Sequence, residues 1–274
     1  SLVPGCALEL EKIFKEANAP AGVFKTLLIH NNQTEKCIAH SSVSAVSFTG
    51  STEAGKVIAS LAGKYLKKCV LELGGSDPYI VLKDADISQA VKVCVKSRIK
   101  NSGQSCIAAK RFIIDHHIYD TFTKKFVEEM NKLVLGFPMA EPTNLGPLAS
   151  IKLRDQLHAQ VQESVKMGAK IELGGIIPPN SGAFYPPTVL SNVQPGMPAF
   201  NEELFGPVAA LIKAEDEVDA IMLANDTDYG LGAAIFSRDV EYAENIGKEL
   251  VEAGSVFINE AVQSDPRLPF GGIK

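Results

Sequence analysis

The stretch Ser47-Phe48-Thr49-Gly50-Ser51-Thr52-Glu53-Ala54-Gly55 runs from an apolar strand through a Gly-Ser-Thr turn into a helix. Apolar side chains recur at helical spacing after the turn, at Ala54, Val57, Ile58, Leu61 and Tyr65. Strand, turn and helix in this order favour an α/β fold in which N–H groups at the helix N-terminus bind a phosphate. The motif is not G-x-G-x-x-G, and a simpler interpretation makes Ser51 or Thr52 the N-cap of the helix.

Strands and helices alternate on both sides of this stretch. Helices are predicted at residues 7–18, 54–65, 87–95, 118–133, 153–167, 217–225 and 240–249. Strands are predicted at residues 24–29, 44–48, 68–73, 79–82, 111–115, 170–173, 188–190, 208–212, 233–237 and 255–259. The alternation predicts an α/β protein with a largely parallel sheet. A second unit is expected to begin at Gly74-Gly75, which divides the chain into residues 1–73 and 74–274.

The composition is that of a globular protein with a sizeable core, because 46% of the 274 residues are hydrophobic. A formal net charge of −5 without a basic patch argues against nucleic acid and anionic membranes as partners. No uninterrupted apolar run approaches the length of a membrane span. The chain begins at Ser1 and enters a helix almost at once, so we expect an internal segment of a longer protein.

Five cysteines stand at positions 6, 37, 69, 94 and 106, without a C-x-x-C pair. This odd set favours a reducing compartment and argues against a disulfide framework or a zinc site. We therefore expect no metal and a cytoplasmic location, with the mitochondrial matrix as the alternative.

One of these cysteines lies in the small polar loop Asn101-Ser102-Gly103-Gln104-Ser105-Cys106-Ile107. A turn of small residues leaves the sulfur accessible and its backbone N–H groups free, as a nucleophile requires. The alternative is a small buried hydrophobe, which is the common role of a free cysteine. Leu71-Glu72-Leu73-Gly74-Gly75 favours the nucleophile, because it places one carboxylate, a candidate base, at the end of an apolar strand.

A further acidic motif, Asn201-Glu202-Glu203-Leu204-Phe205-Gly206-Pro207, precedes the apolar strand at 208–212. Its two carboxylates either reach the hydroxyl groups of a ligand or form a solvated turn.

The chain resembles the aldehyde dehydrogenase superfamily, because five motifs occur together and in order. They are Phe48-Thr49-Gly50-Ser51-Thr52, Leu71-Glu72-Leu73-Gly74-Gly75, Gly103-Gln104-Ser105-Cys106, Glu202-Glu203-Leu204-Phe205-Gly206-Pro207 and Pro269-Phe270-Gly271-Gly272-Ile273-Lys274. Residues 68–78 and 106–114 look like the short bacterial NAD(P)-dependent succinate-semialdehyde dehydrogenases. The resemblance implies part of a Rossmann-type NAD(P)-binding domain in residues 1–73 and a mostly parallel α/β catalytic domain in residues 74–274.

The resemblance also implies roles for individual residues. Cys106 would be the nucleophile that attacks an aldehyde, and Glu72 the base that activates water to hydrolyse the resulting thioester. The cofactor, NAD or NADP, would contact Gly50 and Ser51 at its pyrophosphate, Glu203 at its nicotinamide ribose, and Leu73 and Phe205 beside the nicotinamide. Ser1, at a position where a glutamate would repel the 2′-phosphate of NADP, is expected to tolerate both cofactors.

A semialdehyde substrate carries a carboxylate, for which the available partners are Arg98, Lys100, Ser264 and Arg267. Arg98 and Lys100 have an alternative interpretation as solvated cations at a helix C-terminus. The full-length protein is expected to be a homodimer or homotetramer. In this family the asparagine that completes the oxyanion site lies upstream of where this chain begins. The alternatives are a thioester hydrolase without a redox step, and a non-catalytic fragment or binding protein.

Overall fold

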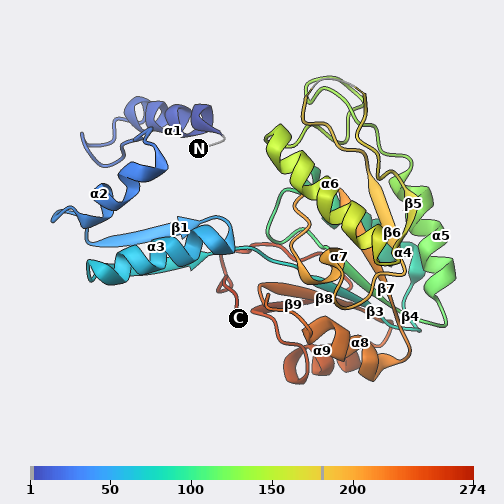
Figure 1. Cartoon of the computed structure of the whole chain (residues 1–274). Helices are drawn as coiled ribbons and strands as arrows, with labels where there is room; N and C mark the ends of the chain where they lie inside the picture. The colour runs from blue at the N-terminus through green and yellow to red at the C-terminus, as the bar shows by residue number, and fades with distance from the viewer. Residues whose placement is uncertain (1–2, 180–181) are drawn as a thin grey trace. The chain divides into compact units, whose positions relative to one another are not determined.

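The computed structural model describes residues 3–179 and 182–274, so Ser1 and the cofactor prediction attached to it lie outside the described residues. The chain divides into two compact units, Ser1–Leu73 and Gly74–Lys274 (Figure 1). No helix within the described parts of the chain is long and apolar enough to cross a membrane.

Unit 1 is built around two parallel strands, β1 (Ala45–Thr49) and β2 (Lys68–Glu72), which α3 (Thr52–Lys64) connects. The register pairs Thr49 with Glu72, so both strands end at the same edge. Two more helices precede this β-α-β element, α1 (Pro4–Glu16) and α2 (Thr34–Ala39), the second led by the short 3₁₀ turn η1 (Asn31–Gln33).

The strand predicted at residues 24–29 is wrong, because these residues form no strand. Their polar groups are bound by α1 instead. The Thr26 N–H donates to a Glu11 carboxylate oxygen at 3.0 Å, and Thr26 Oγ1 donates to the Ala7 carbonyl at 2.8 Å. Lys25 Nζ pairs with the other oxygen of Glu11 at 2.5 Å. Residues 24–29 therefore form a loop that hydrogen bonds and an ion pair hold to α1, although their apolar pattern is that of a strand.

Unit 2 contains a seven-stranded sheet in the order β5-β6-β7-β4-β3-β8-β9. All neighbouring strands are parallel except β5 and β6, which are antiparallel. The strands are β3 (Pro78–Val81), β4 (Arg111–Asp115), β5 (Lys170–Leu173), β6 (Thr188–Ser191), β7 (Val208–Ala214), β8 (Gly232–Phe236) and β9 (Ser255–Ile258). The helical elements are α4 (Ile87–Arg98), η2 (Lys100–Gly103), α5 (Tyr119–Met130), α6 (Ile151–Lys166), α7 (Pro198–Asn201), α8 (Glu217–Asn225) and α9 (Val240–Glu249).

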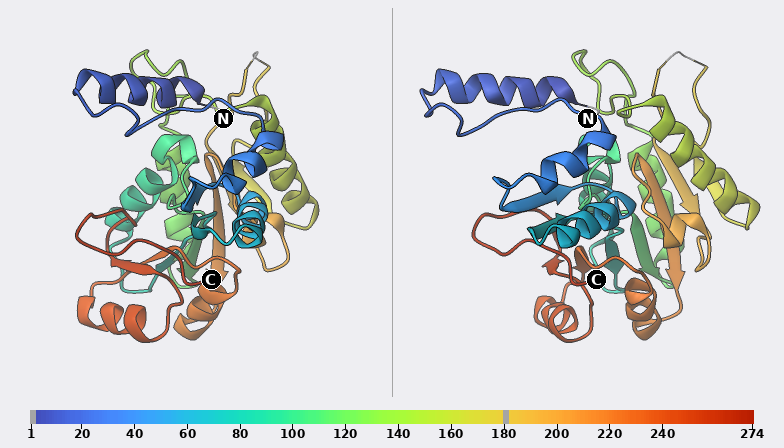
Figure 2. Two further views of the ribbon diagram at one scale, coloured as in Figure 1. Left: turned by 90° about the vertical axis from the view of Figure 1, so that its left-hand side faces the viewer. Right: turned by 60° about the vertical axis from the view of Figure 1, so that its left-hand side comes forward.

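Helices cover both faces of this sheet, with α4 and α6 on opposite sides (Figure 2). Successive strand residues alternate between the two cores. Ile80 of β3 belongs to the same buried cluster as Leu157 of α6, whereas Tyr79 belongs to the cluster that contains Phe126 of α5. Burial on both faces explains why β3, β4 and β8 are apolar almost throughout. The predicted α/β class with a largely parallel sheet is confirmed.

Because these strands are parallel, the segments that enter them share one edge of the sheet. The Cys106 loop enters β4, the Gly75–Asp77 segment enters β3, and the Glu203 segment enters β7. The candidate site is therefore assembled at the amino ends of the strands. The usual position of ligands in open α/β sheets is the carboxyl edge.

Candidate active site

The Cys106 loop has an unusual backbone. Asn101 and Ser102 adopt the left-handed region at φ 52° and 55°, and Gly103 follows at φ 77°. A β-carbon on Gly103 would lie 2.2 Å from the carbonyl oxygen of Gly206, so only glycine fits between the two segments. This turn therefore allows the Cys106 loop to pack closely against the segment that leads into β7.

Lys110 holds the same loop from inside the protein. Its side chain is fully buried, and its ammonium donates to the carbonyl oxygens of Ser105 at 2.9 Å, Cys106 at 2.9 Å and Ala108 at 3.0 Å. An ammonium has three N–H donors, and these three backbone carbonyls are enough to occupy all of them. Burial lowers the pKa of Lys110, and the nearby carboxylate of Glu203 opposes that shift.

Arg98, the last residue of α4, lies in the same region and is fully buried. Its Nη2 donates to the Gly103 carbonyl at 2.7 Å, while Nε and Nη1 have no hydrogen-bond partner in the described parts of the chain. Burial lowers its pKa to about 9. Arg98 thus supports the loop, and its role toward a substrate carboxylate stays a prediction.

The thiol of Cys106 is half-buried. Burial raises its pKa, and the carboxylates of Asp77 and Glu203 act in the same direction. The Lys110 ammonium and the Ile107 N–H oppose the shift, since both favour the thiolate.

Glu203 lies beside this loop, with one carboxylate oxygen 3.2 Å from the Gly75 N–H and 3.4 Å from Lys110 Nζ. Glu203 and Phe205 also line one pocket of about 380 Å³ together with Leu157 and Gln160 of α6. A β-carbon on Gly74 would lie 2.5 Å from the second oxygen of Glu203. Glu203 and Phe205, both predicted to contact the cofactor, therefore line the same pocket, and the Glu203 side chain is partly accessible to solvent.

Asp77 is the buried carboxyl group of the site. Its Oδ1 accepts from the Gly232 N–H at 3.2 Å, and its Oδ2 has no partner among the described residues. Burial raises its pKa to about 7, although Lys110 and Arg111 lower it. Arg111 itself is buried and donates to the carbonyls of Ser76, Leu223 and Ala224 at 3.1, 2.8 and 2.9 Å.

The remaining predicted site residues of the cofactor domain lie in unit 1. Gly50 follows β1 directly and donates its N–H to the Glu72 carbonyl at 3.0 Å, and a β-carbon there would lie 2.6 Å from the Phe48 ring. Ser51 is the N-cap of α3, accepting from the Ala54 N–H at 3.4 Å. A glycine at a helix N-terminus fits a pyrophosphate, because backbone N–H groups are presented without a side chain in the way. Glu72 ends β2 and Leu73 follows it, both partly buried.

Three of the four predicted substrate residues are exposed. Lys100 begins η2, beside the Cys106 loop. Ser264 and Arg267 lie in the segment after β9, where Arg267 pairs with Asp265 through Nε at 2.9 Å and Nη2 at 2.6 Å. Lys100 is the exposed cation nearest in sequence to Cys106.

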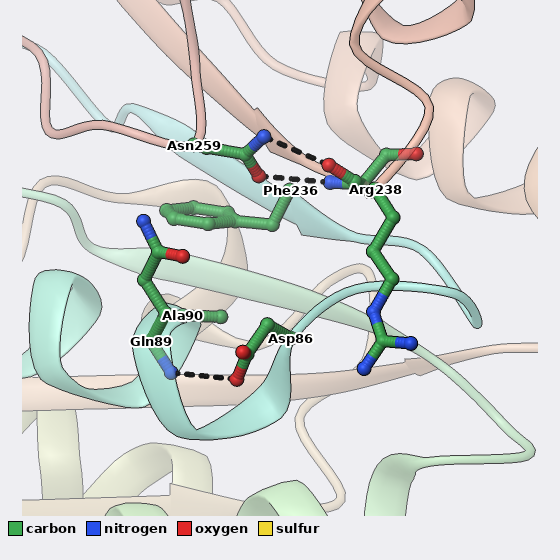
Figure 3. Close-up of a pocket in the computed structure, with 7 residues that line it drawn as sticks. Asp86, Gln89, Ala90, Phe236, Arg238 and Asn259 are labelled. Atoms are coloured by element: carbon green, nitrogen blue, oxygen red, sulfur yellow. Dashed lines mark hydrogen bonds between the residues drawn. The ribbon is translucent and has the colours of Figure 1, made fainter.

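Two other features of unit 2 offer polar groups. A pocket of about 230 Å³ at the carboxyl ends of β8 and β9 contains Asp86, Arg238 and Asn259 (Figure 3). Two of these side chains are used locally, since Asp86 caps α4 and the Asn259 side chain bonds the Ser237 backbone at 3.0 and 2.8 Å. Asp115, His116 and His117 offer ligand atoms within 4.8 Å of one another, which suits a metal ion. The expectation of no metal stays a prediction.

Sequence reasoning did not identify Asp77 and Lys110 as part of the site, nor the buried Arg111 that follows Lys110. The available signal was a pair of cations, Lys110-Arg111, at the start of a strand whose next three residues are apolar. Charged side chains are rarely buried without partners, so such a pair at a strand start indicates a polar network.

Residues 1–274 match the aldehyde dehydrogenase family. The chain belongs to this family, and its α/β fold is that of aldehyde dehydrogenase structures.

Its relatives include the succinate semialdehyde dehydrogenase [NAD(P)+] Sad of Escherichia coli K12, which is 49% identical over 272 residues. That match covers 99% of this chain and 59% of the relative. The NADP(+) succinate-semialdehyde dehydrogenase of Deinococcus radiodurans is 45% identical, with 100% and 57% covered. The succinic semialdehyde dehydrogenase of Streptococcus pyogenes, solved with NADP+, superposes with a TM-score of 0.95 at 39% identity, with 99% and 59% covered. The chain thus spans about three fifths of the length of these relatives.

Proposed function

We propose that this protein is an NAD(P)-dependent aldehyde dehydrogenase in which Cys106 is the nucleophile, and that its substrate is succinate semialdehyde. The observation that carries the proposal is the half-buried Cys106 thiol in a loop whose backbone is fixed by Gly103 and Lys110. The names of the relatives support the substrate and both cofactors. The activity proposed is that of the whole protein, as a cytoplasmic homodimer or homotetramer.

The chain's residues divide the chemistry between the proposed domains. Residues 1–73, the cofactor part, supply Gly50 and Ser51 for the pyrophosphate and Glu72 as the base that activates water. Residues 74–274, the catalytic part, supply the attacking thiolate, and the Cys106 N–H donates to the oxyanion formed from the aldehyde. When bound, NAD(P)+ would accept the hydride, with Glu203 at its ribose and Phe205 and Leu73 beside its nicotinamide.

The first test measures NAD(P)H formation by the full-length protein with succinate semialdehyde and with butanal, an uncharged aldehyde of the same chain length. We expect a higher kcat/KM for the semialdehyde, because Lys100, Ser264 and Arg267 offer polar groups to its carboxylate. Cys106→Ala should abolish turnover, while Cys94→Ala, at a fully buried cysteine of α4, should retain it. Turnover by Cys106→Ala would reject the assignment, and equal kcat/KM values would reject the substrate.

The second test addresses Glu72. Glu72→Gln removes the base but leaves the thiolate, so a single burst of about one NAD(P)H per site should be followed by slow release of product. A general base typically contributes about 10²–10⁴-fold to a rate, so the steady rate should fall by that order. Rapid-quench or stopped-flow absorbance measures both phases. A steady rate close to that of the unmodified protein would assign the base to another residue.

A further inference from the structure

Lys110 contacts the backbone on both sides of the Cys106 thiol through three carbonyl oxygens. Its ammonium lies 2.9 Å from the Ser105 and Cys106 carbonyl oxygens and 3.0 Å from that of Ala108. None of the catalytic, cofactor or substrate roles proposed above is assigned to this lysine. Burying an ammonium group costs free energy, so a fully buried lysine is expected to have a specific role in the protein.

The peptide geometry shows what these contacts do. In a planar trans peptide the C=O of one residue and the N–H of the next point in opposite directions. With the Ser105 carbonyl on Lys110, the Cys106 N–H must point away from the lysine, and the same holds for the Cys106 carbonyl and the Ile107 N–H. The Ile107 N–H lowers the pKa of the Cys106 thiol, which agrees with this direction.

We propose that Lys110 is a positioning residue that turns the Cys106 and Ile107 N–H groups toward the thiol side of the loop, while its charge favours the thiolate. This inference depends on the proposed function in one respect, the assignment of Cys106 as the nucleophile. The charged groups of unit 2 that act on the thiol are Lys110, Asp77 and Glu203, and the two carboxylates oppose the lysine. Lys110 in turn is influenced by Glu203, Arg98, Asp77 and Cys106.

The test measures the alkylation rate of Cys106 by iodoacetamide from pH 6 to pH 10, without aldehyde or cofactor. Mass spectrometry of the tryptic peptide that contains Cys106 separates it from the other four cysteines. Lys110→Met should slow alkylation at pH 7 about tenfold, the change in thiolate fraction for one unit of pKa. The difference should narrow above pH 8, because burial lowers the pKa of Lys110 to about 8 and the unmodified protein then loses the charge as well.

Arg111→Met is the matched control. Arg111 is the next residue, is also buried, and also donates to three carbonyl oxygens, none of them in residues 101–108. A purely structural role for Lys110 predicts that both variants lose stability and that neither changes the pH profile. We expect only Lys110→Met to change it.

The unmodified protein provides a second measurement in case Lys110→Met does not fold. When Lys110 loses its proton it no longer stabilises the Cys106 thiolate. The alkylation rate near pH 8 should therefore rise by less than the tenfold per pH unit of a simple thiol. In urea the same peptide should follow a simple thiol titration. A simple titration in the folded protein, or a Lys110→Met profile that coincides with the unmodified one, would overturn the inference. Neither outcome depends on aldehyde oxidation, so failure of the proposed function is seen separately.

Discussion

At the scale of single residues, the shape of the Cys106 loop depends on a glycine. Gly103 combines a φ of 77° with a close approach to the Gly206 carbonyl, 2.2 Å from where a β-carbon would stand. Gly103→Ala should therefore destabilise the protein by about 2–4 kcal/mol, from left-handed strain and overpacking together. Urea denaturation measures the free energy of unfolding. Aldehyde oxidation should also fall by about a hundredfold, because the thiol is displaced.

Gly196→Ala separates the two causes. Gly196 has a similar backbone angle, φ 92°, but nothing lies within 4 Å of its added β-carbon. This variant should therefore show only the conformational cost, about 1–2 kcal/mol, and unchanged activity. If both variants lost the same stability, the contact with Gly206 would not constrain the loop.

At the scale of elements, local signals predicted the helices and strands well. The helix predicted at residues 217–225 is confirmed by α8, and the one at residues 240–249 by α9. Both begin after an aspartate whose side chain accepts from the backbone, Asp216 and Asp239. Such caps can be read from neighbouring residues alone.

What sequence reasoning could not provide was pairing across long distances. Residues 24–29 have the apolar pattern of a strand, but Glu11 binds the Thr26 N–H. The antiparallel placement of β5 beside β6, in an otherwise parallel sheet, is set by tertiary packing and has no local motif. The order of the seven strands is likewise a property of the assembled core.

The candidate site also combines residues that local motifs predict with residues that only the assembled fold brings in. The motifs pointed to Cys106 and Glu203, and the structure brings these two into one network through Lys110. Lys110 and Asp77 escaped notice because their importance comes from complete burial, which exists only once the strands are assembled. The position of this network at the amino edge of the sheet also follows from topology rather than from a motif.

At the scale of the whole molecule, the two units differ in how much they bury. In unit 1 the two strands stand as an isolated parallel pair, and Val70 of β2 is 60% exposed. In unit 2 every residue of β4 is buried between two helical layers. A two-stranded pair is marginally stable in water.

Hydrogen exchange should therefore distinguish the units in the 274-residue chain. The matched segments are β2 and β4, each of five residues. Amides of β4 should be protected at least tenfold more than those of β2, since core strands open only with the global transition. Mass spectrometry of peptides that cover both strands, corrected for intrinsic rates, provides the measurement. Equal protection would mean that the chain unfolds as one cooperative body.

The contacts that shape the Cys106 loop also set the time at which it can form during synthesis. The seven-residue motif is synthesised early. Gly206, which packs against Gly103, is added about a hundred residues later, and Gly232, whose N–H donates to Asp77, lies 155 residues after Asp77. Chains are made from the N-terminus, and contacts of such long separation form late. A nascent chain therefore carries the motif with an ordinary, unstructured thiol for much of its elongation. The environment of Cys106 described above belongs to the finished sheet, so translation that stops before β8 yields the motif without the candidate site.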